Sequence, residues 1–289
     1  MPPSSIQNAI VPKDGKYHID PQNPMNQLRY IEAWYPPGIS KTDILWGGNT
    51  AKVALLTDST VLKYAWDRTD PYAKKSLDIE NCILSMLGSH DRIVKYLGRH
   101  EHGLRFQLAA NGDVRRYLSS HDRGESPEES VRRKWAKQAA EALAFVHEKG
   151  VVHCDVHPNN LLLDEDLDVR LCDFAGSMFG GLDGGAMESI RFRLPRDCRA
   201  IPDMKSDLFA LGSAIYFIMS DHEPYDSLTE EEVVARYSRM EFPDVQSYSC
   251  GRAITGCWKG ELRSAQDVVN AISGDVVAGF HDIAATLMT

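Results

Sequence analysis

The segment from Val151 to Gly176 constrains this chain more than any other. It reads VVHCDVHPNNLLLDEDLDVRLCDFAG, so that Asp155 and Asn160 precede one short apolar run and Asp173 follows the next. Two carboxylates and an amide on turns beside a predicted β-hairpin suit Mg²⁺ held together with a polyphosphate. We expect Asp155 to accept a hydroxyl proton while Asn160 and Asp173 hold the metal ion. The alternative is that these residues only cap strands at turns, but the order of the pieces favours the first interpretation.

Composition and charge exclude several classes of protein. The 289 residues are 43% hydrophobic and 25% charged, which is typical of a folded globular protein with about two structural units or two lobes. Lys and Arg number 32 against 41 Asp and Glu, a formal net charge of −9. This charge argues against sequence-independent binding to nucleic acid or to anionic membranes. An anionic cofactor therefore needs a local cationic site.

The cysteines and the apolar runs indicate the compartment. Six cysteines are scattered without a C-x-x-C pair, so we expect reduced thiols rather than disulfides. The first residues lack the charged and apolar regions of a signal peptide, and the longest apolar run, 208–219, is too short to span a bilayer. We expect a monomeric cytoplasmic protein, with a nuclear location left open, that binds neither membranes nor nucleic acid.

The pattern along the chain predicts an α+β fold with two lobes. Residues 1–40 are rich in proline and predict a weakly ordered leader, and residues 276–289 predict a tail. Residues 41–108 contain short β-like runs around one helix at 75–88, which predicts a small β-rich N-lobe. Residues 109–275 predict a larger, mainly helical C-lobe, with helices at 126–150, 207–220, 229–240, 250–258 and 264–273. Ser126 and Pro127 are expected to begin the first of these helices, and Gly150 to end it.

The chemistry-bearing residues resemble two motifs of the protein kinase superfamily. His153, Cys154 and Asp155 with Asn160 resemble the catalytic loop HRDxxxxN, and residues 173–176 resemble the metal-binding loop DFG. The resemblance extends over about residues 42–273 and implies a bilobal protein kinase that uses ATP and Mg²⁺. It implies that Asp155 is the catalytic base, that Asn160 and Asp173 bind Mg²⁺, and that Asp207 anchors the backbone of the catalytic loop.

The family also requires a lysine on a strand to hold the phosphates, and a carboxylate on the next helix to hold the lysine. Lys63 in TVLKYA and Glu80 in the predicted helix at 75–88 match these positions. A lysine followed by a glutamate at this distance is common in any chain. The pair gains weight because it lies between a predicted hairpin and the turn at 111–114.

The remaining nucleotide-binding residues are placed by their positions in the resemblance. In the segment where the family has a glycine-rich phosphate loop, only Gly48 matches, because Trp46 and Ala51 stand at other glycine positions; an ordinary hairpin turn is the alternative. Side chains that would surround the adenine, or be plain core residues, are Val53 and Val61 on one face, Leu162 on the other and Phe106 at the back. Backbone groups of Gln107 and Ala109 would bond the adenine edge.

Several departures from the family pattern carry expectations of their own. Cys154 replaces the arginine of HRD, which predicts that activation does not depend on a phosphate on the following segment. His157 replaces a lysine, which predicts a weaker or pH-sensitive transfer step. Ser189 matches a threonine position typical of serine/threonine kinases. Arg196 replaces the glutamate of the APE motif, so we expect that motif's ion pair to be lost.

Three functions remain open from the sequence. The first is an active kinase that transfers the γ-phosphoryl group of Mg-ATP to a serine or threonine of a protein. The second is a pseudokinase that binds a nucleotide or a partner, suggested by the poor glycine loop, His157 and Ala175. The third is a kinase of small molecules, because HxDxHPxN also resembles aminoglycoside and choline kinases. Four arginines, 191, 193, 196 and 199, either favour an acidic substrate or form a solvated charged stretch.

Overall fold

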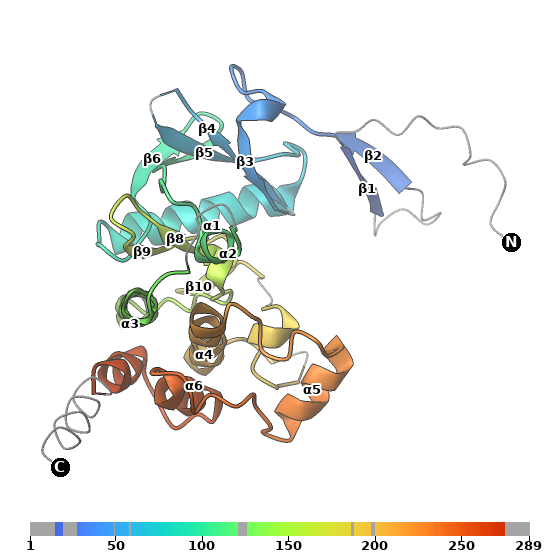
Figure 1. Cartoon of the computed structure of the whole chain (residues 1–289). Helices are drawn as coiled ribbons and strands as arrows, with labels where there is room; N and C mark the ends of the chain where they lie inside the picture. Colours follow the sequence, from blue (N-terminus) through green and yellow to red (C-terminus); the bar gives the residue numbers. More distant parts are fainter. Residues whose placement is uncertain are drawn as a thin grey trace, which may run out of the picture.

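The structure is a computed structural model that describes residues 15–19, 28–48, 50–57, 59–120, 126–185, 188–197 and 200–274, with side chains from Ala33 onward. A β-sheet with one long helix lies above a mainly helical part (Figure 1). This confirms the expected α+β fold with two lobes. In the described part of the chain, no helix combines the length and the apolar character that a bilayer span requires.

The N-lobe is built on an antiparallel five-stranded sheet in the order β3-β4-β5-β7-β6. The strands are β3 (Ile44–Gly47), β4 (Ala51–Leu55), β5 (Thr60–Ala65), β6 (Tyr96–His100) and β7 (Gly103–Gln107). Successive strands are joined by short turns, apart from β5 and β6, between which the chain forms α1 (Pro71–Leu87).

The central strand β5 is buried on both faces. Leu62 and Tyr64 pack with Ala54 in a small outer cluster, while Val61 belongs to the main core on the other side. Side chains alternate along a strand, so Lys63 must share the face of Val61. A lysine thus lies on the inner face of a strand whose residues from Thr60 to Tyr64 are all buried.

Helix α1 supplies the partner surface for this inner face. Asp70 caps the helix by accepting a hydrogen bond from the Tyr72 amide at 2.8 Å, and Pro71 occupies its first turn. The buried face consists of apolar residues with a single exception, Glu80. Because α1 packs against β5, β6 and β7, that carboxylate is carried to the inner face of the sheet.

The C-lobe surrounds α4 (Met204–Ser220), which is buried along most of its length and packs against both α3 and α6. The other helices are α2 (Val114–Ser119), α3 (Glu129–Glu148), α5 (Glu230–Ser238), α6 (Gly251–Trp258) and residues 265–274. Short 3-10 turns are η1 (Lys41–Asp43), η3 (Pro158–Asn160) and η4 (Ile190–Phe192). The apolar run at 208–219 is therefore the core helix of this lobe.

A hairpin at the boundary between the lobes places the Asp173 segment. It consists of β8 (Leu161–Leu163) and β9 (Val169–Leu171). The Leu171 amide donates to the Arg92 carbonyl at 2.8 Å, and the Leu171 carbonyl accepts from the Val94 amide at 2.9 Å. Because residues 92–94 connect α1 to β6, the hairpin is fixed directly beneath the N-lobe.

Some elements differ from the sequence expectations. Within the segment 1–40 the structure pairs β1 (Gly15–Ile19) with β2 (Leu28–Glu32), apart from the five-stranded sheet in Figure 1. Two short strands, β10 (Met178–Phe179) and β11 (Leu182–Asp183), pair within the glycine-rich segment, and β6 was not expected. The tail at 276–289 lies outside the described residues, as do residues 1–14.

The predicted cap of the long C-lobe helix is wrong. Helix α3 begins at Glu129 after Glu128, whose side chain makes no cap bond. Ser126 instead accepts a hydrogen bond from Arg132 Nη2 at 2.6 Å. That arginine also bonds Asp221 at the end of α4, so the tertiary contact between the two helices takes the serine away from the cap position.

Asp168, in the turn of the β8–β9 hairpin, joins that turn to α3. Its carboxylate should make the stability of the fold depend on pH. Partial burial would raise its pKa, but bonds from Lys134, Gln138 and Arg92 outweigh burial and lower the pKa from 3.8 to about 2. A carboxyl with a lowered folded pKa stabilises the fold above its ordinary pKa and loses that contribution as pH falls, here between about pH 4 and pH 2.

We therefore expect Asp168→Asn to lower the free energy of unfolding by about 1 kcal/mol at pH 7, since partial exposure screens the charge. The difference from the wild type should shrink below pH 4. Urea denaturation at pH 7 and at pH 3 measures both values. An equal loss at the two pH values would contradict the role of the charge.

Candidate active site

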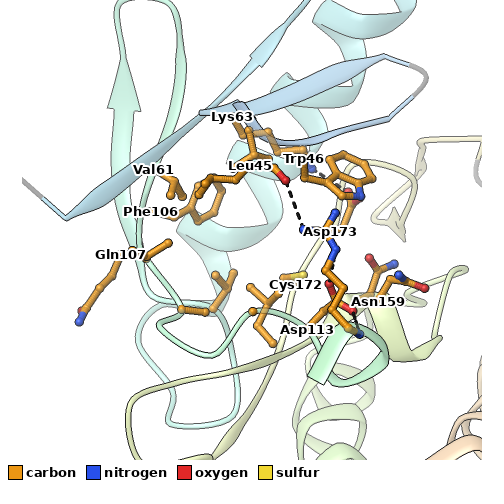
Figure 2. A pocket seen from close by; sticks show the side chains of 18 of the residues that line it. Leu45, Trp46, Val61, Lys63, Phe106, Gln107, Asp113, Asn159, Cys172 and Asp173 are labelled. Atoms are coloured by element: carbon orange, nitrogen blue, oxygen red, sulfur yellow. Dashed lines mark hydrogen bonds and ion pairs between the residues drawn. The ribbon is translucent and has the colours of Figure 1, made fainter. Parts of the chain in front are cut away.

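A pocket lies between the two lobes, with the N-lobe sheet above it and the β8–β9 hairpin below (Figure 2). Its lining contains ten of the residues expected from the sequence: Val53, Val61, Lys63, Glu80, Phe106, Gln107, Ala109, Asn160, Leu162 and Asp173. Gly48 and Asp155 are not part of the lining. The pocket is apolar toward Phe106 and Val61 and charged toward Asp173.

The charged end is organised by one ammonium group between two carboxylates. Lys63 Nζ lies 2.6 Å from Glu80 Oε2 and 2.7 Å from Asp173 Oδ1. The side chains of Lys63 and Glu80 are 7% and 1% exposed, so neither charge is solvated. The Phe174 amide donates to the other oxygen of Glu80 at 3.3 Å, which ties α1 to the Asp173 segment. Three segments far apart in sequence therefore meet at one cation.

The electrostatics of this group follow from burial and from the shared charge. Burial alone would lower the pKa of Lys63, but the carboxylates of Asp173 and Glu80 outweigh it and raise that pKa above its ordinary value. Burial would raise the pKa of Asp173, but Lys63 outweighs it and holds that pKa below its ordinary value. With one ammonium and two carboxylates, the group has a net charge of −1 and can accept a further cation.

Asp155 is held by contacts within its own loop. Asn160 Nδ2 donates to the Asp155 carbonyl at 2.9 Å and to its carboxylate at 3.2 Å. His157 Nε2 lies 3.3 Å from the same carboxylate oxygen. Because Asn160 lines the pocket, it connects Asp155 to the space between the lobes.

The catalytic loop is fixed to the C-lobe core by one buried carboxylate. Asp207, at the start of α4, accepts hydrogen bonds from the amides of His153 and Cys154 at 2.7 and 2.9 Å. His147 Nε2 lies 2.9 Å from the same carboxylate. Asp207 is completely buried. This is the anchoring role that the sequence predicted for Asp207, and His147 was not anticipated.

The His153 side chain joins the catalytic loop to the metal-loop segment. Its Nε2 lies 2.9 Å from the Cys172 carbonyl, and its Nδ1 accepts from the Asp155 amide at 3.3 Å. A neutral ring protonated on Nε2 satisfies both bonds. Cys154 and Asp173 adopt left-handed backbone conformations, with φ of 66° and 64°. Such conformations persist where surrounding contacts hold them, and they are frequent at functional sites.

The site offers oxygen ligands to a cation but cannot enclose one alone. The Asn160 amide nitrogen donates to Asp155, so the amide oxygen is its available ligand atom. Among the described residues, no three His, Cys, Asp or Glu side chains are grouped so that they could hold a metal ion. Asn160 and Asp173 could therefore bind a divalent cation only with water or phosphate oxygens as further ligands.

The arginines after the glycine-rich segment serve mainly as internal contacts. Arg196 forms a buried ion pair with Glu188 at 2.6 Å, so the position that lost the APE glutamate has gained a different pair. Arg191 Nη2 donates to the carbonyls of Tyr225 and Leu228 at 3.2 and 2.6 Å. These two arginines therefore do not form a solvated charged stretch, and an acidic substrate stays a prediction. Arg199 lies outside the described residues.

Several residues that line the pocket were not predicted from the sequence to do so. Leu45, Trp46, Asp113, Arg116 and Cys172 all line it. Asp113 caps α2 by accepting from the Arg116 amide at 2.9 Å, which a helix-capping pattern could have indicated. Arg116 Nη1 donates to the carbonyl of Leu45, another lining residue, at 3.2 Å, and no sequence pattern predicts such a contact.

A β-rich lobe with a buried lysine, a helical lobe with an Asp–Asn loop and a second aspartate, and a pocket between them form the arrangement of protein kinases. The chain matches the protein kinase domain over residues 47–260, and it belongs to that family. The sequence resemblance is thereby confirmed at the level of the superfamily.

Among curated proteins, the chain is similar to Aurora kinase A-B of Xenopus laevis, with 29% identity over 53% of this chain and 38% of the relative. It is also 29% identical to the serine/threonine-protein kinase SIK3 homolog of Danio rerio, over 70% of this chain and 18% of the relative. Serine/threonine-protein kinase RUNKEL of Arabidopsis thaliana is 28% identical over 70% of this chain and 14% of the relative. The chain spans less than half the length of these relatives.

The shared lysine gives a prediction for stability. Lys63→Met leaves Glu80 buried without its cation, which should cost about 3–5 kcal/mol of unfolding free energy. Burial then keeps the pKa of Glu80 raised without opposition, so the folded protein must hold either a proton or a buried charge. The loss should therefore be greater at pH 8 than at pH 5, because stability falls as pH rises through a raised folded pKa.

The double variant Lys63→Met/Glu80→Gln separates charge from packing. It carries no ionisable group at position 80, so its stability relative to the wild type should vary less between pH 5 and pH 8 than that of Lys63→Met. Thermal or urea unfolding measures all three proteins. If both variants show the same pH dependence, Glu80 is not the group left uncompensated.

Proposed function

We propose that this chain transfers the γ-phosphoryl group of Mg-ATP to a serine or threonine hydroxyl of a protein. The observation that supports it most is the convergence of Lys63, Glu80 and Asp173 at one end of an apolar pocket, with Asp155 joined to that end through Asn160. These are the groups that phosphoryl transfer requires for phosphate binding, metal binding and proton acceptance.

The apolar end of the pocket suits the adenine base. Val53 on β4 and Val61 on β5 line the pocket from the N-lobe sheet, and Leu162 on β8 lines it from the hairpin below. The Gln107 side chain points away from the other labelled side chains in Figure 2. The Gln107 amide donates to Lys95, and the Ala109 carbonyl accepts from Gly112. An adenine would therefore bond the Gln107 carbonyl and the Ala109 amide, which are one acceptor and one donor.

At the charged end, Lys63 would hold phosphate oxygens while Glu80 keeps it in position. Asn160 and Asp173 would hold Mg²⁺, and the net charge of −1 and the oxygen donors fit such an ion. When bound, the ion offsets the negative charge of the phosphates. Lys63 and Asp173 bond each other directly in this structure, so nucleotide binding would separate them.

In the transfer step, the substrate hydroxyl oxygen forms a bond to the γ-phosphorus and the bond from that phosphorus to the ADP oxygen breaks. The hydroxyl proton passes to the Asp155 carboxylate. Asn160 and His157 contact this carboxylate, and Asp207 fixes the loop that carries it. The products are a phosphoprotein and ADP.

A protein substrate and serine or threonine as acceptor rest on the family. The matched domain is that of protein kinases, and two of the relatives described above, RUNKEL and the SIK3 homolog, are serine/threonine-protein kinases. This favours a protein over the aminoglycosides or amino alcohols considered above. A nucleotide-binding pseudokinase is the second candidate, because the loop above the pocket departs from the family pattern at Trp46.

Replacement of the proposed base tests the function. Asp155→Asn should lower phosphoryl transfer about 10²- to 10⁴-fold while Mg-ATP still binds, because a positioned base contributes a factor of this size. Transfer of labelled phosphate to serine/threonine and tyrosine peptide libraries measures the rate, and calorimetry measures binding. Asp166→Asn, an exposed change of the same type in the β8–β9 turn, is the control and should leave both unchanged.

Each of the other possible outcomes would support a different function or mechanism for this protein. Mg-ATP binding without transfer by the wild type would support the pseudokinase. Transfer to amino alcohols or aminoglycosides but not to peptides would support a small-molecule kinase. Equal rates for the wild type and Asp155→Asn would remove Asp155 from the mechanism.

A further inference from the structure

Trp46 is turned into the pocket by an irregularity in β3. The register of β3 with β4 shifts between Ile44 and Trp46: Ile44 pairs with Ala54, and Trp46 pairs with Val53. In a regular strand these two residues would share one face. With the extra residue Leu45, Ile44 instead packs in the outer cluster while Trp46 lines the pocket. A bulge that redirects a side chain in this way is a local feature that active-site rims often use.

The indole of Trp46 is seated on Gly48. A Cβ atom at Gly48 would lie 2.4 Å from one ring carbon of Trp46 and 3.0 Å from a second, so only glycine accommodates the ring in this position. The Gly48 amide donates to the Ala51 carbonyl at 2.9 Å to close the turn. Gly48, the glycine that matches the family pattern, therefore presents neither a bare Cα surface nor a free amide to a ligand.

The ring covers the charged end of the pocket rather than the adenine end. Figure 2 shows Trp46 on the side of Asp173, with Phe106 and Gln107 on the opposite side. Lys63 and Arg116 are the two cations in the lining of the described pocket. Arg116 lies 3.4 Å from Asp113 and donates to the Leu45 carbonyl, which holds the bulge from the C-lobe side.

We propose that Trp46 determines ligand specificity at this pocket, so that the base and sugar of a nucleotide supply most of its affinity and the phosphates add little. This inference rests on the proposed function, since it assumes that an adenine nucleotide occupies the pocket. Backbone amides at a glycine-rich turn bind phosphate oxygens because they can approach them closely. Here an apolar ring stands at that place, so the phosphates would depend on the two lining cations, Lys63 and Arg116, and on the metal ligands.

The ratio of two dissociation constants within one protein tests the proposal. Calorimetry gives the dissociation constants of adenosine and of Mg-ATP. The quotient of the adenosine constant divided by the Mg-ATP constant reports how much the phosphates add to the affinity. Trp46→Gly should increase this quotient at least fivefold over the wild type, because it removes the ring and uncovers Gly48. Adenosine binding itself shows that each variant is folded. Trp46→Ala is measured in parallel, so that the result does not depend on one variant.

Two controls separate the ring from general effects. Trp46→Phe keeps a ring on Gly48 and should retain the wild-type quotient within about twofold. Trp34→Phe changes a tryptophan that packs against Tyr64 on the outer face of the sheet, with ring centroids 5.8 Å apart, and should also leave the quotient unchanged.

An unchanged or smaller quotient in both Trp46→Gly and Trp46→Ala would overturn the inference while leaving the proposed function intact. A rise in Trp34→Phe equal to that in Trp46→Gly would overturn it as well. If neither adenosine nor Mg-ATP binds the wild type, the nucleotide site itself is refuted, and the role of Trp46 with it.

Discussion

One buried ammonium group determines how the two lobes must meet. Lys63 is the only charged residue of the buried strand β5, and an unpaired charge in that position would be very costly. Its two partners come from α1 and from the segment after β9, so the helix and the hairpin are both drawn to the inner face of the sheet. The pocket exists where these three segments converge, and its charge follows from the same contact.

A second buried charge, Asp207, fixes the catalytic loop to the core of the C-lobe. Asp207 begins the core helix α4 and receives two consecutive backbone amides of the catalytic loop, with His147 beside it. The left-handed conformation of Cys154 is held by this pair of bonds. His153 then connects the same loop to Cys172, in the segment after β9 that carries Asp173. The positions of Asp155, Asn160 and Asp173 therefore depend on contacts that reach the centre of each lobe.

Much of the fold could be predicted from the sequence, because the long helices have strong apolar periodicity. Helices expected at 75–88, 207–220 and 250–258 are found at Pro71–Leu87, Met204–Ser220 and Gly251–Trp258. The first two of these helices begin earlier than expected, because Asp70 and Asp203 cap their first turns. Strand β6 was missed because its pairing with β7 lies in the tertiary structure and its sequence, YLGRH, contains a glycine and two polar residues. Ser126 misled for a related reason, since its hydroxyl bonds the side chain of Arg132, which also bonds Asp221 at the end of α4.

The sequence by itself determined which groups are candidates for the chemistry, because Asp155, Asn160 and Asp173 occur in ordered motifs. It also indicated the ion pair, through a lysine on a predicted strand and a glutamate on the next helix. Only the tertiary structure decided which neighbours face them. The direction of Trp46 depends on one extra residue in the pairing of two strands, and the contact of Arg116 with Leu45 depends on how the lobes approach. The register of strand pairing and the position of one lobe against the other depend on contacts between residues far apart along the chain. Local residue patterns therefore do not predict them.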